Sequence, residues 1–294
     1  MRSHPLHGLA LATAGALLLT PDALFMRLSG MDGSQMVAWR GLLMGGALLL
    51  AWPLVAGPRL GAELRALAAP ICAVVILCQA GNSLLFSYGI ANAPVAVVLF
   101  GVATVPVFSA LLARLIAGEP TSPATWIAIA AVLSGIALAV LGGAEGGLAL
   151  DLAALTGAAA GLGVALALAF GFVVMRHARG IPILPVIGLG ALCSGLIGLA
   201  LAGPAALLEG EVWAIAVSGA VILPVSFFAL TAATRHTHAS NVSLLMLLET
   251  VLGPVWVWLG TGEAPTWPML AGGAIVVGSL TLYLLHLRRA ARRA

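Results

Sequence analysis

"VPVFSALLARLIAGEPTSPATWIAIAAVLSGIAL", residues 105–138, recurs in diverged form as "ETVLGPVWVWLGTGEAPTWPMLAGGAIVVGSLTL", residues 249–282. The two segments align without gaps at an offset of 144 (249 minus 105). Gly118-Glu119 then matches Gly262-Glu263, and Leu138 matches Leu282. An internal repeat of this kind predicts a fold made of two related halves.

The composition places these halves in a lipid bilayer. Of the 294 residues 62% are hydrophobic and only 8% are charged, and the mean hydropathy is +1.13. A soluble domain carries about 25% charged residues. The apolar N-terminus imitates a signal peptide, but no A-x-A cleavage site precedes Asp22. We therefore expect it to be kept as the first membrane span.

Ten segments have the roughly 20 apolar residues that a membrane span requires. The break at Asn92-Ala93-Pro94 is the least marked. The predicted spans are 6–27, 34–56, 66–88, 94–115, 124–141, 149–174, 183–202, 212–233, 239–260 and 267–287.

The arginines orient these spans. With the N-terminus in the cytoplasm, eleven arginines lie on the cytoplasmic side and only Arg27 lies outside. This is the usual excess of positive charge in cytoplasmic loops. Because each half has an odd number of spans, the second half must be inverted relative to the first. The predicted fold is an all-α integral membrane protein of ten transmembrane helices in two inverted five-helix repeats, residues 1–142 and 148–294, with both termini cytoplasmic.

Two stretches carry a family resemblance: "LLFSYGIANAPVAVVLFGVATVPVFSALLARLIAGEP" (84–120) and "ALTAATRHTHASNVSLLMLLETVLGPVWVWLGTGE" (229–263). Each resembles the EamA type of the drug/metabolite transporter superfamily, which has a small-residue turn, a helix with Pro or Glu-Pro midway, and Gly-Glu at the loop. The resemblance covers the whole chain. It implies a metabolite carrier, usually an exporter of amino acids or similar molecules, with a cavity between helices 1, 3, 4, 6, 8 and 9.

One position departs from the family pattern. Leu248-Glu249-Thr250 stands where the family often has Leu-Glu-Pro, and the nearest proline is Pro254. Because proline bends helices, we expect the bend of the ninth helix to be displaced towards Pro254.

Two charged residues inside spans are predicted to pair. Asp22 and Arg40 both lie about 9 Å below the outer surface, at 1.5 Å per residue. An ion pair would offset the cost of each charge in lipid. We interpret the pair as an outer gate or a structural clamp, with Arg27 as a rival partner for Asp22.

The substrate-binding residues are predicted from polar faces on three helices. On the third helix, four residues recur at i, i+3, i+4 and i+7, which places them on one face. Phe227 and Thr231 on the eighth helix are interpreted as apolar core. The predicted substrate-binding set is Gln79, Asn82, Ser83, Phe86, Phe100, Thr104, Asn241, Leu245 and Glu249.

Glu249 lies about 15 Å deep, near the bilayer midplane, where a carboxylate costs about 2.5–3.5 kcal/mol. Two interpretations stay open. Glu249 is either a protonated strut, hydrogen-bonded to amides such as Gln79 or Asn82, or an ionised group in a wet cavity that meets a substrate ammonium or a proton.

Other functional classes find little support. No nucleophile–base–orienter set or phosphate loop indicates an enzyme or a cofactor, and His236 and His238 are too few for a metal site. Cys72, Cys78 and Cys193 lie in apolar runs without a CxxC motif, and the scattered arginines do not form a nucleic-acid surface. We predict a secondary transporter of the bacterial inner membrane, as a monomer or homodimer, that exports amino acids or similar metabolites by alternating access. The alternatives are an exporter of drugs or nucleosides and a non-transporting membrane scaffold.

Overall fold

The computed structural model describes residues 5–92, 98, 101–141, 152–178, 180–262 and 267–293, and within these ranges it contains helices and no strand. Seven described helices are long and apolar enough to cross a bilayer, and three shorter apolar helices accompany them. The seven are His7–Ser29, Gly33–Leu67, Pro70–Gly89, Ala159–His177, Ile183–Ala202, Val212–Thr234 and Ala239–Gly260; the shorter ones are Val105–Ile116, Pro123–Gly135 and Leu270–Tyr283. The joint expected at residues 142–147 and the Pro94 break lie outside the described residues.

The helices of the first half are α1 (Pro5–Leu19), α2 (Asp22–Ser29), α3 (Gly33–Ala56), α4 (Leu60–Leu67), α5 (Pro70–Asn92), α7 (Val105–Ala117) and α8 (Pro123–Leu141). Those of the second half are α9 (Leu152–His177), α10 (Ile183–Ala202), α11 (Val212–Val217), α12 (Leu223–Thr234), α13 (Ala239–Met246), α14 (Leu248–Thr261) and α15 (Trp267–Arg293). A π-helical turn, Ser218–Ile222, joins α11 to α12.

Three of these membrane segments are interrupted midway. Pro21 separates α1 from α2, a turn at Ala103 and Thr104 precedes α7, and Leu247 separates α13 from α14. Leu247 lies 144 residues after Ala103 (247 minus 103), so both breaks fall at the same place in the repeat. The displacement towards Pro254 that the sequence led us to expect is therefore wrong. An i→i+3 hydrogen bond from the Leu247 amide to the Leu244 carbonyl tightens the chain there without a proline.

Close glycine contacts bring α3 against α10. A Cβ on Gly41 would lie 2.5 Å from the Cα of Gly195, so only glycine permits this backbone approach. Residue numbers rise along α3 while those of the facing residues fall along α10, which makes the two helices antiparallel. The facing pairs are Ala38 with Gly198, Gly41 with Gly195, and Leu48 with Gly188.

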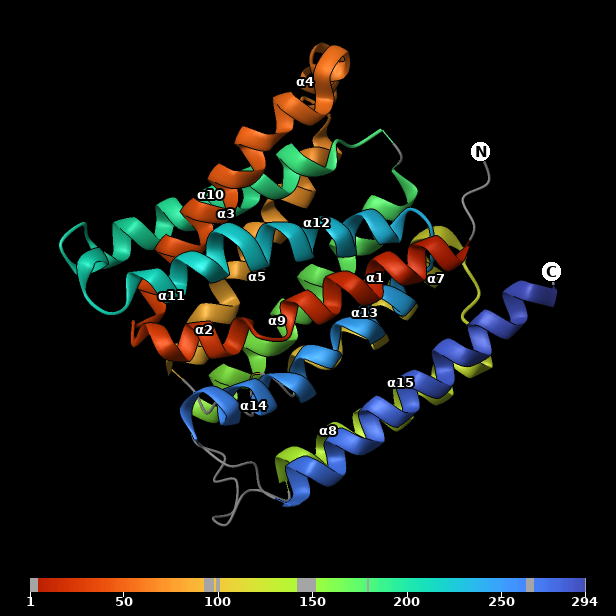
Figure 1. The fold of residues 1–294 in the computed structure, drawn as a ribbon. Coiled ribbons are helices and arrows are strands. Elements are labelled where there is room, and N and C mark those ends of the chain that lie inside the picture. The colour runs from red at the N-terminus through yellow and green to blue at the C-terminus, as the bar shows by residue number, and fades with distance from the viewer. Residues whose placement is uncertain are drawn as a thin grey trace.

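The helices α8 and α15 form a second antiparallel pair. The hydroxyl groups of Thr125 and Tyr283 lie 2.8 Å apart near one end, and Gly135 packs against Gly272 further along. Figure 1 shows this pair along one side of the molecule, with α3 and α10 on the other side and α1, α9, α12 and α13 between them.

The N-terminal end of α3 is fixed by a capping box. Asp32 Oδ1 accepts a hydrogen bond from the Gln35 amide at 2.9 Å, and Gln35 Oε1 accepts one from the Asp32 amide at 2.7 Å. The hydrogen bond from the Gln35 backbone lowers the pKa of Asp32. Trp39 Nε1 then donates to the Leu207 carbonyl at 2.8 Å, which ties α3 to the link between α10 and α11.

Candidate functional site

A cavity of about 490 Å³ lies where the interrupted helices meet. This volume is within the range of small-molecule sites, about 300–1,000 Å³. Its lining includes residues on both sides of two helix breaks, namely Leu19 and Asp22 at the first, and Met246 and Glu249 at the second. Discontinuous helices of this kind form the substrate sites of many secondary transporters.

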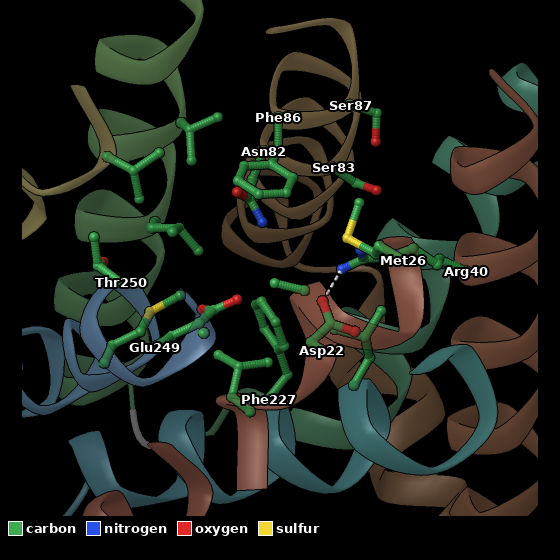
Figure 2. A pocket seen from close by; sticks show the side chains of 18 of the residues that line it. Asp22, Met26, Arg40, Asn82, Ser83, Phe86, Ser87, Phe227, Glu249 and Thr250 are labelled. Atoms are coloured by element: carbon green, nitrogen blue, oxygen red, sulfur yellow. Dashed lines mark hydrogen bonds and ion pairs between the residues drawn. The ribbon is translucent and has the colours of Figure 1, made fainter. Parts of the chain in front are cut away.

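Two charged residues meet at one side of the cavity. Arg40 Nη2 donates a hydrogen bond to Asp22 Oδ2 at 2.6 Å, and Arg40 Nη1 contacts the sulfur of Met26 (Figure 2). Ser218, in the π-helical turn, donates to Asp22 Oδ1 at 2.5 Å. Asp22 is 1% exposed. It is therefore a buried carboxylate that is both paired and hydrogen-bonded.

The N-termini of α2 and α14 stabilise the two carboxylates of the cavity. Asp22 lies in the first turn of α2 and Glu249 in the first turn of α14. Unpaired N–H groups give the N-terminus of a helix a partial positive charge, and this stabilises a nearby carboxylate. The break at Leu247 therefore explains in part why an acidic residue is tolerated in this apolar segment.

Glu249 is partly exposed to the cavity, on the side across from Asp22 in Figure 2. It makes no hydrogen bond or salt bridge with any residue that the structure describes, although Asp22 and Arg40 act on it electrostatically. Gln79 and Asn82 line the same cavity without bonding to it. The hydrogen-bonded strut considered from the sequence is thus not formed in this state.

The remaining walls are apolar and adaptable. Four of the eight methionines line the cavity, together with Phe86 and Phe227. Met side chains are flexible and polarisable, and they adjust to ligands of different shape. The methionines are Met26, Met36, Met44 and Met246.

The structure brings only part of the predicted substrate-binding set together. Gln79, Asn82, Ser83 and Phe86 line the cavity from one face of α5, and Glu249 lines it from α14. The prediction for Phe100 lies outside the described residues. Phe227, interpreted from the sequence as core, is also in the lining, whereas Thr231 is buried away from it.

Three residues of that set lie elsewhere. The Thr104 hydroxyl donates to the Gly101 carbonyl at 2.6 Å and so belongs to the break before α7. Leu245 is 1% exposed within the core. Asn241 Oδ1 accepts a hydrogen bond from the Tyr283 hydroxyl at 2.6 Å, in a polar cluster outside the cavity. The structure therefore does not place Thr104, Leu245 or Asn241 in the cavity lining.

Several lining residues were missed by sequence reasoning. Ser87 continues the polar face of α5, and Thr250 adjoins Glu249, so both carried a signal. The methionines carried none, because an apolar residue that lines a cavity has the same sequence pattern as one in the core.

Sequence and structure comparisons agree with this architecture. The profile of the EamA-like transporter family matches the chain twice, at residues 6–141 and 155–285. No curated protein matches the sequence significantly. Among solved structures 27 chains are similar, including one described only as the crystal structure of a protein, which has 18% sequence identity and a TM-score of 0.77. That similarity covers 96% of this chain and 98% of the other, and at this identity it establishes the fold alone.

Proposed function

The chain belongs to the EamA-like transporter family and is a multi-pass membrane transporter of small molecules; from this premise we propose that it exports amino acids or similar small metabolites. The substrate would cross the bacterial inner membrane by alternating access, and the 490 Å³ cavity would be the substrate site.

We further propose that ten transmembrane helices form two inverted repeats, residues 1–142 and 148–294, with both termini in the cytoplasm. The antiparallel pairs α3–α10 and α8–α15 support this arrangement, because each joins a helix to the one five spans later. The repeat relates α5 to α12 and α9 to α1. The contact of α5 with α9 therefore has an equivalent in the contact of α12 with α1, and the structure contains both. A reporter fused after Arg293 should read as cytoplasmic, and a periplasmic reading would refute the topology.

The observation that carries the substrate proposal is the mixture of charge and apolar surface in one cavity. Glu249 offers a carboxylate without a hydrogen bond to any described residue, which suits a substrate ammonium. Arg40 carries five N–H donors, and its contacts with Asp22 and Met26 leave others for a substrate carboxylate. The methionine and phenylalanine walls suit an apolar side chain.

We assign binding to Gln79, Asn82, Ser83, Phe86 and Glu249, and we keep Phe100 on the strength of the resemblance. Gln79 and Asn82 have amides that can donate to and accept from a zwitterion. Asp22 and Arg40 would form the outer side of the site, either as a gate or as a clamp.

Counterflow in liposomes tests the proposal. The purified protein should exchange labelled amino acids, aromatic ones included, and should not exchange a nucleoside or a sugar. Exchange of nucleosides or cationic drugs alone would support the alternative exporter. A folded protein with no flux of any compound in the panel would support a scaffold.

A further inference from the structure

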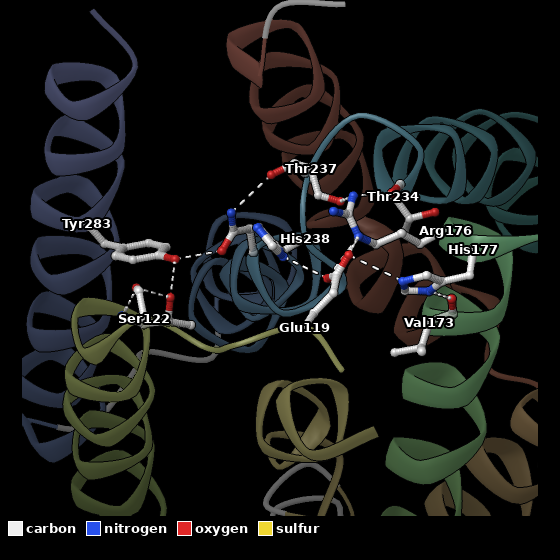
Figure 3. A network of polar contacts seen from close by, with 11 residues as sticks. Glu119, Ser122, Val173, Arg176, His177, Thr234, Thr237, His238 and Tyr283 are labelled. Atoms are coloured by element: carbon white, nitrogen blue, oxygen red, sulfur yellow. Dashed lines mark hydrogen bonds and ion pairs between the residues drawn. The ribbon is translucent and has the colours of Figure 1, made fainter. Parts of the chain in front are cut away.

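A second polar cluster lies outside the cavity lining, and Glu119 is at its centre (Figure 3). Arg176 Nε donates to both carboxylate oxygens of Glu119, at 2.8 and 3.1 Å. His238 Nδ1 lies 2.8 Å from Oε2, and His177 Nε2 lies 3.3 Å from Oε1. One carboxylate thus holds three basic side chains.

The charge state of Glu119 suits this role. Burial works against ionisation, but hydrogen bonds from His238 and Arg176, together with their positive charge, outweigh it and hold the pKa of Glu119 below its usual value. Glu119 is therefore an anion at neutral pH. Its side chain is still 20% exposed, so water can replace its partners when they separate.

The cluster joins both halves of the chain. Glu119 follows α7 in the first half, whereas Arg176 and His177 end α9 and His238 precedes α13 in the second. Arg176 Nη1 also donates to the carbonyls of Thr234 and Thr237, at 3.2 and 2.6 Å. It therefore closes the C-terminal end of α12, where free carbonyls favour a cation.

A chain of hydrogen bonds extends the cluster to the outlying helix pair. Asn241 Nδ2 donates to Thr237 Oγ1 at 3.0 Å, and Tyr283 donates to Asn241 Oδ1 at 2.6 Å. The Tyr283 hydroxyl is also 2.8 Å from that of Thr125 on α8. These contacts tie α13 to α8 and α15.

An apolar layer separates the cluster from the cavity. Arg176 comes eight residues after Leu168, the last cavity residue of α9, a distance of about 12 Å along the helix. The side chains that follow the last cavity residues on α9 and α12 include two from one buried cluster that are at most 3% exposed, Phe172 and Leu230. At this end the cavity is closed by an apolar layer and then by the Glu119 cluster.

We propose that Glu119 is the latch of the inner gate, and that its contacts with Arg176, His177 and His238 must break before the cavity opens to the cytoplasm. This inference rests on the proposed transport function and on the predicted orientation, in which the Glu119 end faces inward. The structure is then the state with the inner gate closed. A latch made of polar contacts near the surface suits a gate, because its groups are rehydrated when it opens, whereas an apolar seal alone would expose only hydrocarbon.

Cysteine accessibility tests the latch without any substrate. In a protein free of native cysteines, Ser83→Cys places a thiol in the cavity lining. A membrane-impermeant maleimide should label it slowly from the cytoplasmic side in inside-out vesicles. Adding Glu119→Gln should raise that rate by about fivefold or more, the effect of losing roughly one charge-assisted contact. An unchanged rate in a folded Glu119→Gln protein would overturn the proposal.

Glu63→Gln is the matched control. Glu63 is a second carboxylate predicted to lie at the cytoplasmic side, and it accepts a hydrogen bond from Trp52 Nε1 at 2.7 Å without joining the Glu119 cluster. Its removal should leave labelling of the cavity thiol unchanged. An equal rise in both variants would indicate general loosening, which contradicts a specific latch.

A covalent lock gives an independent test that needs no intact carboxylate. A short bifunctional thiol reagent across Glu119→Cys and His238→Cys should abolish transport, and a reducible linker should restore it on reduction. Undiminished transport by the cross-linked protein would overturn the latch. If labelling of the cavity thiol follows these expectations but the protein transports no amino acid, the proposed substrate is contradicted. The latch is still supported in that case.

Discussion

Arg40 Nη2 donates to Asp22 Oδ2 at 2.6 Å, and this contact joins the second membrane span to the break of the first. The two side chains are 12% and 2% exposed, so the pair is largely withdrawn from water. Removing one member of a buried pair leaves an unpaired charge and costs about 3–5 kcal/mol.

We therefore predict that Asp22→Arg and Arg40→Asp each lower the thermal stability in detergent and transport, and that the double variant recovers part of the loss. Recovery should be incomplete, because the guanidinium introduced in place of Asp22 would face the positive N-terminus of α2 and lose the hydrogen bond from Ser218. A double variant no more stable than the worse single variant would show that the charges are not coupled.

A second prediction concerns Glu249. Glu249→Gln keeps the shape of the side chain and removes its ability to carry charge. The variant should therefore fold and still bind substrate in detergent. Because an amide attracts an ammonium far less than a carboxylate does, the preference for amine-bearing substrates or the pH dependence of transport should change. Counterflow with matched pairs of compounds, with and without an amine, measures this. Glu211→Gln, which removes an exposed carboxylate bonded to Trp213, is the control. An unaltered pH profile and substrate range would leave Glu249 a structural role only.

A third prediction follows from the face of α5 that lines the cavity. Cysteines at Gln79, Asn82, Ser83 and Phe86 should react with a water-soluble thiol reagent, and bound substrate should slow the reaction. Leu77 is 70% exposed on the bundle surface, where lipid would cover it, so a cysteine there should react slowly. Faster labelling at Leu77 or Leu84 than at the four cavity positions would contradict the assignment.

The residues that the sequence predicted on α5 line the cavity, whereas those predicted on α13 do not, and helix continuity accounts for the difference. Helical spacing places residues on one face only while the helix is continuous, as α5 is from Pro70 to Asn92. The break at Leu247 changes the path of the chain between Leu245 and Glu249. The i, i+4, i+8 pattern of Asn241, Leu245 and Glu249 therefore did not correspond to a shared surface.

The break itself could not be found from residue types. Pro21 and Pro106 mark two of the three interruptions, whereas the third has no proline and matches the second only through the repeat. The partners of Glu119 were equally hidden, because they lie 57 to 119 residues away in the chain. Only the position of Glu119 in the repeated Gly-Glu motif drew attention to it.

A fourth prediction concerns the stability of the protein at acidic pH. Folding lowers the pKa of Glu119 below its usual value of 4.5, so the folded state favours the ionised form. The resulting stabilisation is complete above the pKa of the unfolded chain and is lost as the pH falls through the lower pKa of the folded state. In thermal melts the stability difference between the wild type and Glu119→Gln should therefore shrink on acidification from neutral pH to below 4.5. A difference that stays constant over this range would contradict the ionised contact with Arg176.

The last prediction tests the α3–α10 contact, on which the antiparallel pairing of the halves depends. A Cβ at position 41 would lie 2.5 Å from the Gly195 amide nitrogen and 2.6 Å from the Ala191 carbonyl oxygen. These are backbone atoms, so the two helices must move apart to admit it. Overpacking of this kind costs about 1–3 kcal/mol.

Gly46, on the same helix, has no atom within 4 Å of where its Cβ would be. Alanine there should be neutral or stabilising by up to about 1 kcal/mol, because glycine weakens a helix interior. We expect Gly41→Ala to melt at a lower temperature in detergent than the wild type, and Gly46→Ala to melt at the same temperature or higher. Equal melting temperatures for the two variants would mean that α3 and α10 do not approach through these glycines.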